Sequence, residues 1–210
     1  MIHRLSRVLN AIANYDTELG YVQGMNFLVG ALLIHWEECI AFWLVIDLFE
    51  SYDMRQNYEE GLIGMYRHSQ ILEKLLKKHI PEVSQHFEDC DIKTEMFMSD
   101  WVISFLCSYI PLHRIADFFT RFFERGWPAF HSMVISILHY LKRKILDWED
   151  MLETLNAIKS MKEHRNSFTW KQSSSKQNNR RNRRFDEQKP FRFEGKRYFN
   201  NKFFRFKSPS

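Results

Sequence analysis

Residues 20–26 read Gly20-Tyr21-Val22-Gln23-Gly24-Met25-Asn26, and an apolar run from Phe27 to Ile34 follows them directly. The run predicts a helix whose apolar side chains are buried. Gln23 therefore stands between two glycines at the start of that helix, and glycine lets another backbone approach closely. Two interpretations of Gln23 remain open. It is either an exposed carboxamide that orients a water or meets a partner, or a buried one that bonds to nearby backbone groups.

The motif and the segments after it resemble the TBC-type GTPase-activating domain that acts on Rab GTPases. Tyr21-Val22-Gln23 is similar to that family's YxQ glutamine finger, and Gly24-Met25-Asn26 to the residues that continue it. Residues 37–44, EECIAFWL, are similar to the acidic-then-AFW segment that begins the family's next helix. Residues 99–105 and 124–126 resemble two later family segments. The likeness runs from about Met1 to Lys162.

The resemblance implies an activator of a partner enzyme, a Rab-family small GTPase, in the regulation of vesicle trafficking. Such activators supply a glutamine in trans to orient the hydrolytic water and an arginine to stabilise the developing charge. Gln23 would be the water-orienting residue, supported by Tyr21, Met25 and Asn26, with Gly24 permitting close approach. GTP and Mg²⁺ would belong to the partner, and we expect no cofactor or metal site in this chain, which has no GxxxxGK[ST] phosphate loop.

The family's arginine finger lies in an IxxDxxR motif some tens of residues before the YxQ motif. Only Met1 to Leu19 precede Tyr21-Val22-Gln23 and its glycine, and nothing there fits that motif. Arg4 and Arg7 fall on the helix expected over residues 2–13, so the arginine role is not carried onto either. We therefore expect a domain over residues 1–165 that lacks its N-terminal portion and leaves Leu5 and Leu9 without partners. The alternative is a catalytically inactive TBC-like module that binds a Rab or acts as a scaffold.

Apolar periodicity predicts helix after helix, so the expected fold class is all-α, an irregular multi-helix bundle. The pattern predicts helices over residues 98–109 and 130–145. Pro81 and Pro111 mark helix starts, and Gly126 marks a break before Trp127. Asp147 resembles the N-cap of a last helix that ends near residue 163.

Charge divides the chain near residue 165. Residues 1–165 hold 17 Lys and Arg against 23 Asp and Glu, whereas residues 166–210 hold 13 against 3. The second part is rich in Ser, Asn, Gln and Arg with interspersed Phe, which predicts a disordered basic tail. Such a tail could touch an anionic membrane surface, bind single-stranded nucleic acid, extend into solvent, or dock on an acidic partner. We favour membrane over nucleic acid because Rab partners live on membranes.

The cysteines, the longest apolar stretch and the histidines bear on the location of the protein and on metal binding. Cys39, Cys90 and Cys107 are odd in number and widely spaced, and we expect reduced thiols in the core of a cytoplasmic protein. The longest apolar stretch is far shorter than the roughly 20 residues that span a bilayer. His131 and His139 share a helix face only approximately, and no third metal ligand accompanies them, so we do not expect them to form a metal site. The expected location is therefore cytoplasmic, with peripheral contact to endomembranes.

Overall fold

The computed structural model describes residues 1–168, and these contain helices and no strand. The predicted all-α fold is thereby confirmed. In chain order the helices are α1 (Ile2–Tyr15), α2 (Met25–His35), α3 (Glu38–Ser51), α4 (Ile63–His79), α5 (Pro81–Asp89), α6 (Glu95–Ile103), α7 (Ile115–Arg125), α8 (Trp127–Leu146), α9 (Met151–Lys159) and α10 (Met161–His164), with short 3₁₀ helices η1 (Met54–Asn57), η2 (Leu112–Arg114) and η3 (Arg165–Ser167).

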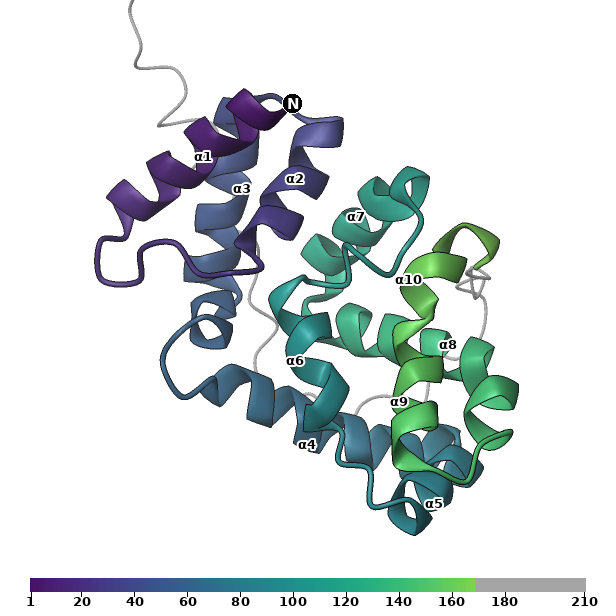
Figure 1. Ribbon diagram of the computed structural model, residues 1–210. Helices are drawn as coiled ribbons and strands as arrows, with labels where there is room; N and C mark the ends of the chain where they lie inside the picture. Colours follow the sequence, from purple (N-terminus) through teal and green to yellow (C-terminus); the bar gives the residue numbers. More distant parts are fainter. Residues whose placement is uncertain (169–210) are drawn as a thin grey trace, which may run out of the picture. The chain divides into compact units, whose positions relative to one another are not determined.

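Helices α1, α2 and α3 pack on one another, and the loop between α1 and α2 carries the YxQ motif (Figure 1). The 3₁₀ helix η1 connects α3 to α4 and packs against both. Helix α4 also contacts α5, α6 and α8, while α8 contacts α7 and α9. The loop that carries Gln23 therefore belongs to the α1–α3 layer, and η1 leads from that layer to the rest of the fold.

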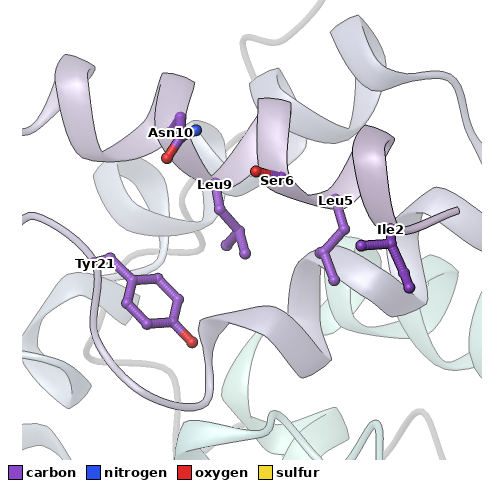
Figure 2. Close-up of a pocket in the computed structure, with 6 residues that line it drawn as sticks. All are labelled: Ile2, Leu5, Ser6, Leu9, Asn10 and Tyr21. Carbon is purple, nitrogen blue, oxygen red and sulfur yellow. The ribbon is translucent and has the colours of Figure 1, made fainter.

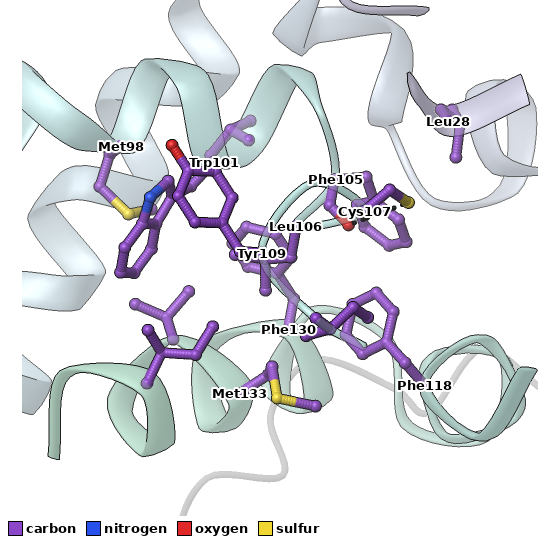
Figure 3. Packing of buried hydrophobic residues seen from close by; sticks show 14 of the residues in the cluster. Leu28, Met98, Trp101, Phe105, Leu106, Cys107, Tyr109, Phe118, Phe130 and Met133 are labelled. Carbon is purple, nitrogen blue, oxygen red and sulfur yellow. Dashed lines mark hydrogen bonds between the residues drawn. The ribbon is translucent and has the colours of Figure 1, made fainter. Parts of the chain in front are cut away.

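Aromatic side chains fill the centre of the core (Figure 3). Phe105 is fully buried, and its ring lies 4.7 Å from that of Phe122 in an edge-to-face arrangement and 5.6 Å from that of Phe130 in a stacked one. Aromatic pairs in these geometries contribute about 0.5–1.5 kcal/mol beyond the area they bury. Ring contacts with two other helices, α7 and α8, therefore hold the segment around Phe105 in place.

The helix predicted over residues 98–109 is wrong in its second half. Helix α6 ends at Ile103, and Phe105 and Leu106 have φ angles of 49° and 58° in the left-handed region. The N–H of Leu106 donates to the carbonyl of Trp101 at 2.9 Å and closes the turn. Residues 104–110 are all buried, so this segment has no exposed face, and the spacing of its apolar residues reflects burial on every side.

Other helix boundaries follow the sequence more closely. Helix α5 begins at Pro81, and α8 begins at Trp127 directly after Gly126, whose φ is 66°. The assignment of Asp147 as an N-cap is wrong, because it follows the end of α8. The cap of α9 is Asp150, whose side chain accepts the N–H groups of Leu152 and Glu153.

The structure bears on two further expectations, the end of the helical body near residue 165 and the burial of the three cysteines. Phe168 is buried and packs on the ring of Tyr140, with 5.4 Å between centroids, so the helical body includes residues beyond 165. The predicted basic tail past this point, residues 169–210, lies outside the described residues. All three cysteines are free, but Cys39 is exposed, so the expectation of three core thiols is wrong. Within residues 1–168 no helix is long and apolar enough to cross a membrane.

Candidate functional site

The loop between α1 and α2 begins with a tight turn at Asp16. The carboxylate Oδ1 of Asp16 accepts the N–H of Leu19 at 3.1 Å, and its carbonyl accepts the N–H of Gly20 at 2.8 Å. Gly20 has a φ of 63°, a left-handed conformation that glycine adopts without steric cost. This turn ends the course of α1 and leads the chain through residues 21–23 into α2.

Side chains from the first turn of α2 hold the end of the loop. Asn26 Oδ1 accepts the N–H of Gly24 at 3.2 Å, and the sulfur of Met25 lies 3.5 Å from the N–H of Val22. Met25 is buried and Asn26 is half-buried. Met25 and Asn26 thus contact the backbone on either side of Gln23.

Gly24 is the N-cap residue directly before α2, has a φ of 106° and lies against α6. A Cβ atom built at this position would be 2.1 Å from Cγ2 of Ile103. The space that the glycine leaves is thus occupied by a side chain of the same protein. Gly24 was expected to let a partner approach, and the structure adds an internal reason for the glycine.

Gln23 itself is exposed, which excludes the interpretation of a buried glutamine. None of the hydrogen bonds within residues 1–168 engages its carboxamide. Tyr21 is 53% exposed and Phe27, one helical turn after Gln23, is 46% exposed. The expectation that Phe27 and Ile34 are buried is wrong, because both lie on the side of α2 that faces away from the core. Two exposed aromatic side chains therefore flank Gln23.

A groove of about 300 Å³ lies between Tyr21 and one face of α1 (Figure 2). Leu5 and Leu9 point into it, and Ile2, Ser6 and Asn10 complete its lining. Leu5 and Leu9 are half-buried and pack against the core, so they do not lack partners as expected. The groove gives the exposed loop an apolar flank.

A family model described as Rab-GTPase-TBC domain matches residues 1–146. This chain belongs to the Rab-GTPase-TBC domain family.

Relatives and a solved structure agree with this assignment. The TBC chain is 28% identical over 154 residues to Rab GTPase-activating protein tbc-11 of Caenorhabditis elegans, covering 72% of this chain and 16% of that protein. It is 28% identical over 142 residues to GTPase activating protein Gyp51 of Schizosaccharomyces pombe, covering 68% and 14%. The chain thus spans about a sixth of the relatives it matches. The crystal structure of the Chlamydomonas flagellar RabGAP TBC domain has a TM-score of 0.66 and 23% identity, covering 78% of this chain and 55% of that one.

The two arginines nearest the motif in sequence are engaged elsewhere in this TBC fold. Arg7 makes a bidentate pair with Glu38 at 2.8 and 2.6 Å. Arg4 donates to the carbonyl of Trp36 at 3.1 Å and lies 3.4 Å from Glu38. Both guanidinium groups therefore tie α1 to the start of α3. Neither arginine is therefore assigned the role of an arginine finger.

Residues 1–168 show no group of three or more His, Cys, Asp and Glu side chains arranged to hold a metal ion. His131 instead pairs with His68, with 3.2 Å between Nε2 and Nδ1. Both rings are buried between α4 and α8, and the ring of Trp127 lies 3.9 Å from that of His68. This pair could not be predicted from the sequence, because the two histidines are 63 residues apart in the chain.

Proposed function

We propose that this chain acts as a GTPase-activating domain for a Rab-family small GTPase, and that Gln23 is the residue it supplies in trans to orient the hydrolytic water. The observation that carries the proposal is the exposed carboxamide of Gln23 on a loop whose backbone is held on both sides. A positioned side chain lowers a barrier because its orientation is set before the reaction. The held backbone would give Gln23 a defined position, and the family model and the relatives named as Rab GTPase-activating proteins support this role.

The partner would supply the nucleotide, its Mg²⁺ and the phosphate-binding loop. Gln23 would align the water with the terminal phosphate, which is the positioning task that phosphoryl transfer requires of a protein side chain. Tyr21 and Phe27 would contact the partner on either side of Gln23, since exposed aromatic side chains contribute strongly to protein interfaces. A peripheral contact of the basic tail with anionic membranes would add a second attachment near membrane-bound Rab proteins.

The test is the rate of GTP hydrolysis by a panel of GTP-loaded Rab proteins with the full chain. Gln23→Ala should lower the stimulated rate about a hundredfold, as the loss of a positioned catalytic donor does elsewhere. Binding to Rab proteins that carry a non-hydrolysable GTP analogue should change less than threefold. Gln70→Ala is the matched control, because Gln70 is an exposed glutamine on α4.

A separate variant tests the partner surface. Phe27→Ala should weaken Rab binding at least tenfold, because truncation of an aromatic hot spot at an interface costs about 2 kcal/mol or more. Its thermal unfolding should match that of the parent, since the ring is nearly half exposed. If the chain binds Rab proteins without stimulating them, and Gln23→Ala behaves like the parent, the chain is the inactive binding module of the alternative hypothesis.

A further inference from the structure

Arg55 on η1 makes a bidentate ion pair with the residue that begins the Gln23 loop. Its Nε lies 2.6 Å from Oδ2 of Asp16, and its Nη2 lies 3.0 Å from Oδ1. Nη1 also pairs with Glu59, and Nη2 lies 3.5 Å from Glu18. The Arg55 side chain is 30% exposed and that of Asp16 is 18% exposed, so the pair is screened less than a surface pair.

Asp16 is well suited to transmit this contact to the loop. Its Oδ1 accepts both Arg55 Nη2 and the N–H of Leu19, so one oxygen joins η1 to the turn. The hydrogen bond from Arg55 holds the pKa of the Asp16 carboxyl below its usual range. The carboxylate therefore stays ionised, and the pair is intact, throughout the neutral pH range.

The same segment of the chain also holds the other end of the loop. Tyr58 directly follows η1, and its hydroxyl donates to the carbonyl of Ile103 at 2.8 Å. The side chain of Ile103 in turn occupies the space beside Gly24. Residues 55–58 thus attach to the loop at its first residue through Asp16 and at its last through Ile103.

From these contacts we infer that Arg55 is a positioning residue that holds the loop of residues 16–24 in the conformation that presents Gln23. The inference rests on the proposed function of Gln23. A planar guanidinium with two parallel donors fixes the angle of a carboxylate as well as its distance, which a lysine ammonium does not do. The loop would then have a fixed direction, and Gln23 a fixed position relative to the partner.

The first arm of the test measures how well the loop is ordered, by a method that does not depend on GTPase activity. Hydrogen exchange of the full chain is compared for the parent, Arg55→Lys and Asp16→Asn. Arg55→Lys keeps the positive charge but loses the two parallel N–H donors of the guanidinium. Asp16→Asn keeps an oxygen that can accept the N–H of Leu19 but loses the negative charge. Both should exchange at least tenfold faster in the peptide that covers residues 16–24, because each removes a charge-assisted bidentate contact.

The second arm measures hydrolysis by a GTP-loaded Rab. Arg55→Lys should lower kcat about tenfold and leave KM within twofold, because displacement of a positioned group slows the chemical step. The control is Lys142→Gln, which breaks the 2.9 Å pair between Lys142 on α8 and Glu82 on α5 at a side chain of 29% exposure. It should change neither kcat nor the exchange of residues 16–24.

A combined variant decides whether Arg55 acts through Gln23. In a Gln23→Ala background, Arg55→Lys should have no further effect on kcat. An equal loss in both backgrounds would overturn the inference, and so would unchanged exchange of the loop in Arg55→Lys and Asp16→Asn. If Gln23→Ala alone leaves turnover unchanged, the proposed function fails, and with it the inference that Arg55 affects turnover by positioning Gln23. The exchange arm then still decides whether Arg55 orders the loop.

Discussion

Gly24→Ala tests how the Gln23 loop is packed against α6. At a φ of 106°, an alanine is strained by about 1–3 kcal/mol. Its Cβ would also lie 2.1 Å from Cγ2 of Ile103, a branched side chain that is stiff about χ1 and cannot swing away freely. Such overpacking costs a further 1–3 kcal/mol or so. We therefore expect the free energy of unfolding to fall by about 2–6 kcal/mol, a large share of the roughly 5–15 kcal/mol of a typical domain.

The assay is urea unfolding followed by far-ultraviolet circular dichroism on the parent, Gly24→Ala, Ile103→Ala and the double variant. Ile103→Ala removes Cγ2, so the clash disappears in the double variant and only the backbone strain remains. The two changes should then be coupled by about 1–3 kcal/mol. Additive losses would refute the packing argument. If Gly24→Ala is as stable as the parent but no longer stimulates a Rab, the glycine serves the approach of the partner instead.

Two further predictions concern stability away from the loop. Burial lowers the pKa of His68 to about 3 and that of His131 to about 4, so the unfolded chain takes up protons first. The contribution of the two neutral histidines to stability should be lost as the pH falls through 6.5, with a slope that approaches about 1.4 kcal/mol per pH unit for each histidine near pH 5. His131→Gln should remove about half of this slope in urea titrations. Asp150→Ala should destabilise the chain by about 1 kcal/mol through the lost cap of α9, whereas Asp147→Ala should stay within about 0.5 kcal/mol in the same assay.

The helices could be predicted wherever apolar and polar faces alternate along the chain. Helix α8 is such a case, and its start after Gly126 follows from local rules for breaks and caps. The end of α6 could not be predicted in this way. Phe105 and Leu106 keep a helical spacing of apolar residues, but the surrounding rings bury the whole segment. Either a turn or a helix can bury these side chains, so their spacing does not distinguish the two conformations. Contacts with residues distant in the sequence determine that the chain forms a turn here.

The exposure of residues around the motif shows the same limit. A run of apolar residues from Phe27 to Ile34 predicts a helix correctly, yet periodicity alone cannot say which of its sides meets the core. Both terminal members of the run are exposed, and Phe27 lies one turn from Gln23. The resemblance to the TBC family indicated a candidate site at Gln23, whereas the exposure of the Phe27 ring near it could be recognised only from the fold.

The ion pair of Arg55 with the loop of residues 16–24 can be anticipated in part from the distribution of charge in the sequence. Arg55 is the only lysine or arginine between Arg7 and Arg67, and that interval contains nine acidic residues. A lone cation among so many carboxylates is expected to pair with one of them, but charge counting cannot choose which. The choice of Asp16 follows from the packing of η1 against α3 and from the turn that leaves the Asp16 carboxylate facing η1. The position of Gln23 is thus set partly by a residue 39 positions beyond the start of its loop.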